Sequence, residues 1–190
     1  ILFDQFGKPK TVKMAFSFEP GKEYEARIDA SINLERTVPL GVFQLPLIAY
    51  DPFAYSKHLP DDITWGSEEI TFEYNYLLGH EGSTGMVELT NPDTIDLYVE
   101  GLAVKPIIEI EGSADNLTIK NQGQTIRFPS FSNTSWLIDC EEYEVYRNGE
   151  QDYDAIRLRE FWVYQGNNRV EINGNNIDLT IRFKYRDRFL

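Results

Sequence analysis

The sequence has few of the residues on which most catalytic and metal sites depend. Its 190 residues include one cysteine, Cys140, and two histidines, His58 and His80. A single cysteine excludes an internal disulfide, and two histidines exclude a histidine-rich metal centre. The sequence therefore lacks the histidine and cysteine residues from which most zinc-enzyme and serine-hydrolase sites are built. We expect no catalytic residue, no cofactor and no bound metal.

Long apolar runs and positive charge are also scarce. No stretch approaches about 18 consecutive apolar residues, so we expect no membrane-spanning helix. No signal peptide is visible, and because the chain begins with Ile1 we expect a fragment. The 18 basic and 31 acidic residues give a net charge of −13. That charge repels phosphate backbones and argues against a nucleic-acid partner.

Strand-forming residues are abundant. Alanine occurs 8 times, against 17 isoleucines, 12 phenylalanines and 11 tyrosines. Apolar and polar residues alternate over Tyr24–Leu34 and Val12–Phe18, which predicts two strands joined by a turn at Glu19–Lys22. A third predicted strand, Val42–Tyr50, contains Pro46, which favours an edge or a bulge.

The charge distribution predicts a domain boundary near Ser56. Residues 1–56 hold 7 acids and 6 bases, a net charge of −1, whereas residues 57–190 hold 24 acids and 12 bases, a net charge of −12. The charge reverses again at the end, where Arg182, Lys184, Arg186 and Arg188 alternate. Cross-strand ion pairs and an acidic patch on another subunit are both open as partners of these bases.

Residues 57–190 read as a series of short strands, which is typical of an antiparallel sandwich or barrel. Asn148-Gly149 and Asn173-Gly174 are predicted hairpin turns, because asparagine and glycine tolerate positive φ. The strands that we predict here are Ile70–Tyr76, Ile107–Glu111, Leu117–Ile119, Gln124–Phe128, Ser135–Asp139, Glu142–Tyr146, Leu158–Tyr164, Arg169–Ile172 and Ile177–Tyr185.

Carboxylates are the first candidates for chemistry. A glycoside hydrolase needs two carboxyl groups facing each other across the sugar. Glu109 with Glu111, and Glu142 with Glu144, stand two residues apart on predicted strands, which favours a solvated sheet face instead. Calcium is a second candidate, because acidic and amide side chains cluster in two loops, although their spacing does not match the EF-hand pattern. These side chains are Asn148, Asp152 and Asp154 around Gly149, and Asp61 with Asp62.

Aromatic side chains are candidates for stacking on sugars. Trp136 and Trp162 lie in predicted strands and are expected in the core. Trp65 lies in a predicted loop and is the best candidate for an exposed aromatic contact. Cys140 stands between Asp139 and Glu141, which would raise its thiol pKa and make it a poor nucleophile.

Segments along the chain resemble, in order, the siphophage distal tail protein family, often called Dit. Eight segments carry the resemblance. The first four resemble parts of the family's N-terminal tail domain. The last four resemble, in turn, the opening strand, the central hairpin, the Gly-x-Asn turn and the closing strand of its C-terminal domain. These segments are Phe18–Ile28, Ile32–Arg36, Leu40–Leu45, Asp51–Ser56, Lys105–Gly112, Leu137–Gly149, Gln165–Ile172 and Arg182–Leu190.

The resemblance implies an all-β fold in which residues 1–56 are the remnant of a ring-forming N-terminal domain. Residues 57–190 would then be a galectin-like antiparallel β-sandwich. It also implies a non-catalytic virion protein at the tail tip, assembled as a hexameric ring in the bacterial cytoplasm. Its partners would be sister subunits, the tail tube, and tail-associated and receptor-binding proteins.

Our alternative hypothesis is a module that binds host cell-wall polysaccharide, with Trp65 as a stacking platform. A glycan-cleaving enzyme using Glu109 or Glu142 is the weakest of the three hypotheses.

Overall fold

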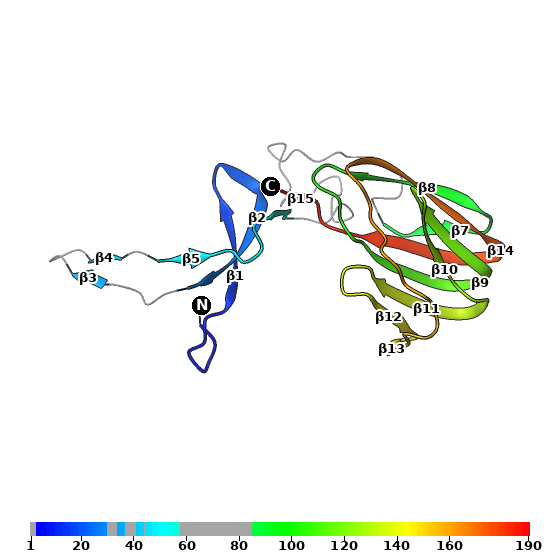
Figure 1. Ribbon diagram of the computed structural model, residues 1–190, viewed down its shortest axis with the longest axis horizontal. Helices are drawn as coiled ribbons and strands as arrows, with labels where there is room; N and C mark the ends of the chain where they lie inside the picture. Colours follow the sequence, from blue (N-terminus) through cyan, green and yellow to red (C-terminus); the bar gives the residue numbers. More distant parts are fainter. Residues whose placement is uncertain (1–2, 30–33, 37–40, 44, 58–84) are drawn as a thin grey trace. The chain divides into compact units, whose positions relative to one another are not determined.

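The computed structural model describes residues 3–29, 34–36, 41–43, 45–57 and 85–190 (Figure 1). Over these residues the protein is all-β, with strands joined by turns and no helix. The chain divides into two compact units: Ile1–Lys57 together with Phe189–Leu190, and His58–Arg188. The sequence assigned the last two residues to the second domain, whereas they belong to the first unit because the chain ends on a strand of that unit's sheet.

The first unit contains a small sheet and a separate hairpin. β1, β5 and β6 each pair with β2 in antiparallel fashion, and β15 adjoins β6, while β3 and β4 pair with each other. The strands are β1 (Thr11–Phe16), β2 (Glu19–Ile28), β3 (Leu34–Arg36), β4 (Gly41–Phe43), β5 (Leu47–Ile48), β6 (Ala54–Ser56) and β15 (Arg188–Phe189).

The β1–β2 hairpin confirms the predicted pairing but shows that the predicted turn is wrong. The chain turns at residues 17–18, and the segment Glu19–Lys22 opens β2 instead. Pro20 has no N–H to donate, and the β1 ladder shifts register next to it. Lys22 pairs with Ser56 of β6, so the proline–glycine segment marks a change of strand partner rather than a turn.

Two predicted strands of this unit are shorter than expected. Val42–Tyr50 is not one strand but contributes to β4 and β5, which lie on either side of Pro46. The Pro46 carbonyl accepts a hydrogen bond of 3.3 Å from the Asp29 N–H. The predicted strand Tyr24–Leu34 is described as β2 up to Ile28, and residues 30–33 of that prediction lie outside the described part of the chain.

The second unit is an antiparallel β-sandwich. Its strands follow the order β13-β12-β11-β9-β14-β7, with β10 added on β9 and β8 on β14. The strands are β7 (Val87–Leu89), β8 (Asp93–Val99), β9 (Ile107–Asn121), β10 (Gln124–Arg127), β11 (Phe131–Asp139), β12 (Glu144–Arg147), β13 (Glu150–Gln151) and β14 (Gly166–Lys184).

Two long strands, β9 and β14, run through both layers of the sandwich. They pair with each other along most of their length, but one half of this ribbon adds β11 and β7, and the other half adds β10 and β8. The β9–β14 register shifts between Asn173 and Asp178, where Asn116 and Asn176 adopt positive φ. Such bulges bend a strand, and here they fold one continuous ribbon around the core.

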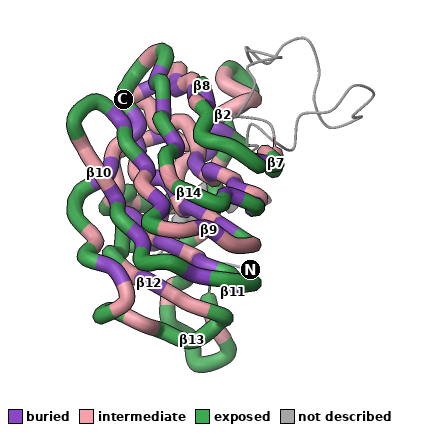
Figure 2. Tube along the Cα trace, turned by 90° about the vertical axis from the view of Figure 1, so that its right-hand side faces the viewer, coloured by how far each residue is buried: buried purple, intermediate pink, exposed green. Residues whose placement is uncertain are grey.

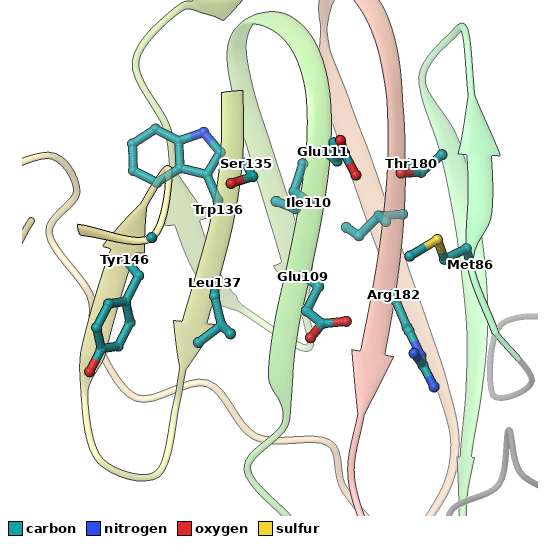
Figure 3. Close-up of a pocket in the computed structure, with 12 residues that line it drawn as sticks. Met86, Glu109, Ile110, Glu111, Ser135, Trp136, Leu137, Tyr146, Thr180 and Arg182 are labelled. Carbon is teal, nitrogen blue, oxygen red and sulfur yellow. The ribbon is translucent and has the colours of Figure 1, made fainter. Parts of the chain in front are cut away.

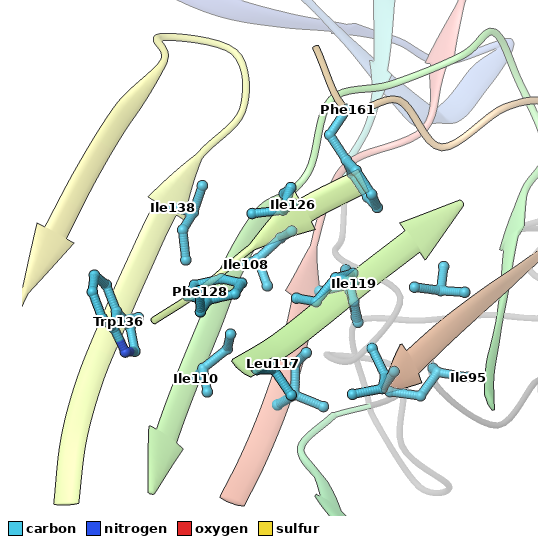
Figure 4. Packing of buried hydrophobic residues seen from close by; sticks show 14 of the residues in the cluster. Ile95, Ile108, Ile110, Leu117, Ile119, Ile126, Phe128, Trp136, Ile138 and Phe161 are labelled. Carbon is cyan, nitrogen blue, oxygen red and sulfur yellow. The ribbon is translucent and has the colours of Figure 1, made fainter. Parts of the chain in front are cut away.

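The core lies between the two halves of this ribbon (Figure 4). Ile108, Ile110 and Ile138 from one layer pack in the same cluster as Leu117 and Ile119 from the other. Buried and exposed residues alternate along these strands (Figure 2), so the period-2 pattern of the sequence is the pattern of burial.

Trp136 is confirmed as a core residue. It is 2% exposed, and its ring meets Phe128 and Phe131 edge-on at centroid distances of 5.5 and 5.9 Å. The Arg147 guanidinium also lies 5.3 Å from the ring centroid. The indole is therefore packed in the core of the sandwich and is not an exposed stacking platform.

Four strands predicted from the sequence merge into the two long ones. Ile107–Glu111 and Leu117–Ile119 both belong to β9, and β14 absorbs both predicted strands that flank Asn173-Gly174. The hairpin turn predicted at Asn173-Gly174 is therefore wrong, because β9 supplies pairing partners on both sides of it. At Asn148-Gly149 the turn is confirmed, with φ of 53° and 81° between β12 and β13.

The predicted strand Leu158–Tyr164 is extended but forms only an isolated bridge to Val104. Side-chain amides take the place of a partner strand. The Trp162 N–H donates to Gln124 Oε1 at 2.7 Å, and the Tyr164 N–H donates to Asn168 Oδ1 at 2.8 Å. Backbone groups satisfied in this way need no ladder.

The strands β6, β7, β8 and β13 were not predicted. The buried residues Ile95, Leu97 and Val99 alternate along β8, so a period-2 signal was present there. The predicted strand Ile70–Tyr76 lies outside the described residues.

Candidate functional site

A groove crosses the outer face of one layer of the sandwich, on the side away from the core (Figure 3). Its volume is about 470 Å³, and it extends over β12, β11, β9, β14 and the segment leading into β7. A volume of this size falls within the usual range of small-ligand pockets. The groove is therefore the candidate binding site.

Strand register places the side chains of the groove in two rows. Tyr146, Leu137, Glu109 and Arg182 stand opposite one another on β12, β11, β9 and β14, and form the first row. Residues directly opposite on antiparallel strands point to the same face, so this row spans four strands on the solvent side (Figure 3).

The second row consists of Ser135, Glu111 and Thr180, which stand opposite one another on β11, β9 and β14. Ser135 and Glu111 are exposed, and Thr180 is half-buried. Among the residues that the structure describes, none of these three side chains has a hydrogen-bond or ion-pair partner. Polar groups in this state are available to a ligand.

Polar contacts hold two side chains of the first row, Glu109 and Tyr146, in place. Lys184 Nζ lies 2.7 Å from Glu109 Oε1, in an ion pair between β14 and β9. The Tyr146 hydroxyl donates a 2.8 Å hydrogen bond to Glu144 Oε2. This hydrogen bond is the main reason that the pKa of Tyr146 is raised, with burial adding to it. The ring of Tyr146 is therefore held in one orientation at the edge of the groove.

The carboxylate predictions have different outcomes. Ile108 and Ile110 point into the core, which confirms that Glu109 and Glu111 share the solvent face of β9. The prediction for Glu142 and Glu144 is wrong, because Glu142 lies in the turn before β12. The Glu142 N–H donates to the Asp139 carboxylate at 3.0 Å, so this segment closes a turn instead of extending the strand.

In the loop around Gly149 that was a candidate for calcium, side-chain oxygens already accept hydrogen bonds from nearby backbone N–H groups. Asp152 Oδ1 accepts a 3.1 Å hydrogen bond from the Ala155 N–H, and Asn148 Oδ1 accepts one of 2.9 Å from the Ser135 N–H. In the described parts of the chain, no group of three or more histidine, cysteine or acidic side chains is placed to hold a metal. Asp61, Asp62, His58 and His80 lie outside those parts.

The other tryptophans also differ from expectation. Trp65 lies outside the described residues. Trp162 is half-buried rather than part of the core, and it is not in a strand. Lys105 Nζ lies 4.8 Å from the Trp162 ring centroid and 4.6 Å from that of Tyr143, so one cation sits against both rings.

Cys140 is buried at the end of β11. Burial, more than the neighbouring Asp139 carboxylate, raises the pKa of its thiol to about 12. A thiol in this state is a poor nucleophile, as the sequence predicted, although burial rather than adjacent charge is the larger cause.

The basic residues at the end of the chain do not share one strand. β14 ends at Lys184, where the ion pair with Glu109 confirms a cross-strand partner. Arg186 follows the strand, and Arg188 lies in β15, where Nη2 donates to the Ala103 carbonyl at 3.0 Å.

The first unit carries an exposed cluster of aromatic side chains, which we call the hairpin cluster and define as Phe16, Phe18 and Tyr24. Phe16 stacks on Phe18 at 5.2 Å between centroids and meets Tyr24 edge-on at 5.5 Å. Phe18 is 76% exposed and Phe16 is 41% exposed. Contiguous exposed apolar patches are typical of interaction surfaces.

Sequence reasoning missed the groove residues Tyr146, Ser135, Thr180 and Arg182 as a group. Each occupies an outward position on a predicted strand, and that alternation was the available signal. Which strands lie side by side, and in what register, is not encoded in the alternation. The grouping therefore required the tertiary structure.

No known protein family matches this chain, and no curated protein is detectably related to it. In the part of the chain that the structure describes, no helix is long and apolar enough to cross a membrane.

Proposed function

We propose that the protein is a structural component of a bacteriophage tail tip, of the distal tail (baseplate hub) type, and has no catalytic activity. In this proposal it joins the tail tube to the host-adsorption apparatus of the virion. The first unit packs against sister copies, and the galectin-like second unit supports receptor-binding and other tail-associated proteins. The observation that carries the proposal is the exposed apolar surface of the first unit.

The first unit buries few apolar side chains and exposes several large ones. Its buried apolar residues, among those described, are Ala26, Ile28 and Ala54. In contrast, Phe6 and Phe18 are 77% and 76% exposed. Burying a phenylalanine side chain is worth about 1.5–3 kcal/mol, so leaving several in water is costly unless another protein surface covers them.

The charge distribution favours sister copies as the surface that covers the first unit. Residues 1–56 have 7 acids and 6 bases, a net charge of −1, so copies of this unit repel one another little. Residues 57–190 have a net charge of −12 and repel one another, which favours an outward position in an assembly. The family that the sequence resembles assembles as a ring of six copies, and we propose the same for this protein.

The test is assembly of the complete gene product, measured by light scattering and negative-stain microscopy. We expect rings from the parent and loss of rings from the double variant Phe16→Ser with Phe18→Ser, because the hairpin cluster would no longer stabilise the interface. The matched control is Tyr153→Ser, which removes a 58% exposed aromatic from the second unit and should leave the rings intact. A parent that stays monomeric at high concentration, or a double variant that still forms rings, contradicts the proposal.

A further inference from the structure

We propose that the groove on the second unit binds an uncharged glycan segment. The second row (Ser135, Glu111 and Thr180) would hydrogen-bond sugar hydroxyls, and the Tyr146 ring with Leu137 would contact the apolar face of a sugar ring. This binding role does not depend on the assembly role proposed above.

The second row supplies the hydrogen bonds. The Glu111 carboxylate accepts, and the hydroxyls of Ser135 and Thr180 both donate and accept. Facing side chains on neighbouring antiparallel strands are about 4.5–5.5 Å apart at Cβ, so the three groups form a line across three strands. A glycan presents hydroxyls at intervals along its length, and each hydroxyl requires both a donor and an acceptor nearby. The row has both, and no described protein group uses them.

The first row supplies an apolar wall. Tyr146 and Leu137 stand opposite each other on β12 and β11, and the hydrogen bond to Glu144 holds the tyrosine ring in place. Aromatic side chains combine a large apolar surface with little conformational freedom to lose on binding. A pyranose has hydroxyls at its edge and C–H groups on its face, and the two rows match these two parts.

The charge of the groove favours an uncharged ligand. Glu111 forms no ion pair among the described residues, and Glu88 of β7 stands opposite Thr180 at the end of the same row, whereas Arg182 adds one positive charge to the first row. The two carboxylates of the second row would therefore repel an anionic polymer such as a teichoic acid that lies along that row. The Glu109 carboxylate is already paired with Lys184, which reduces the attraction for a cationic ligand. Hydroxyls flank Glu111 on both sides, and they match a polyol better than an ammonium group.

The experiment is a titration of the ¹⁵N-labelled 190-residue chain with three sets of probes, followed by amide chemical shifts. The sets are uncharged oligosaccharides of hexoses and N-acetylhexosamines, a glycerol-phosphate teichoic acid, and oligolysine. We expect at least one uncharged oligosaccharide to shift amides of β9, β11 and β14. We expect weaker binding by about tenfold or more in Glu111→Gln and in Thr180→Val, because each removes a hydrogen bond to the ligand.

Glu171→Gln is the matched control, since Glu171 is an exposed carboxylate on β14 in the other layer and outside the groove. It should leave binding unchanged. Both groove variants replace outward-facing side chains with similar shapes, and their amide spectra report whether the fold is intact. Binding of only teichoic acid or only oligolysine overturns the proposal. So does the absence of shifts with every uncharged probe at millimolar concentration, or equal binding by parent, Glu111→Gln and Thr180→Val. None of these results bears on ring assembly.

Discussion

Replacing Gly112 by alanine should severely destabilise the second unit. Gly112 lies in the middle of β9, opposite Thr134 on one neighbouring strand and Leu179 on the other. Its φ is 138°, and a Cβ atom there would lie 2.3 Å from the Asp178 carbonyl oxygen and 2.6 Å from the Leu179 Cα. Both close atoms are backbone atoms of β14, so no side chain can move aside to relieve the overlap.

Two costs add in this variant. The unfavourable φ of an alanine costs about 1–3 kcal/mol. Forcing a methyl group into a closed space costs roughly 1–3 kcal/mol more. The sum is about 4 kcal/mol. The free energy of unfolding of a typical domain is roughly 5–15 kcal/mol, so the variant loses a large part of it. With a urea m-value of about 2 kcal/mol per molar, the unfolding midpoint should fall by about 2 M.

The assay is urea unfolding followed by tryptophan fluorescence, which reports on the buried Trp136 in the core of the second unit. The control is Gly123→Ala, because Gly123 also has a positive φ, 88°, but its Cβ would meet no atom within 4 Å. The control should lose only the conformational cost, about 1–2 kcal/mol. Equal losses in the two variants would show that close packing of β14 on Gly112 is not what requires a glycine there.

Two further predictions concern buried titratable groups. Cys140 should stay unlabelled by a thiol reagent at pH 8 in the folded protein and react fully in denaturant, because its thiol pKa is about 12; rapid labelling of the native chain would contradict its burial. Burial raises the pKa of Asp187 from 3.8 to about 6, despite a 3.0 Å hydrogen bond from the Glu100 N–H. The folded state therefore binds this proton more tightly than the unfolded state, and its contribution to stability is lost as pH rises from about 4 to 6. Relative to Asp187→Asn, the parent should lose about 2–3 kcal/mol of unfolding free energy over that range in urea titrations. Parallel pH profiles of parent and variant would contradict the raised pKa.

Much of the fold was predictable because a strand with one buried face repeats every two residues. That pattern identified the strands of the β1–β2 hairpin and the inward direction of Ile108 and Ile110. Turn composition correctly identified the Asn148-Gly149 turn but failed at Glu19–Lys22 and at Asn173-Gly174. Both segments have turn composition, but both find pairing partners in strands distant in sequence.

The candidate site was predictable only in part. Glu109 and Glu111 were expected on a solvent face, and they line the groove. The second row (Ser135, Glu111 and Thr180) was not expected, because its members come from three different strands. Trp162 departs from its predicted strand because side-chain amides, such as that of Gln124, take over its backbone hydrogen bonds.

The sequence by itself determined the all-β class, the direction in which most strand residues point, and the scarcity of histidine and cysteine that limits metal and thiol chemistry. The tertiary structure decided which strands are neighbours, how β9 and β14 bend through both layers, and which outward side chains meet in the groove. The physical reason is that the alternation of apolar and polar residues depends only on which face of a single strand is buried and which face meets water. Register depends instead on contacts between residues far apart in the chain, and a shift of one residue would move every side chain of a strand to the opposite face.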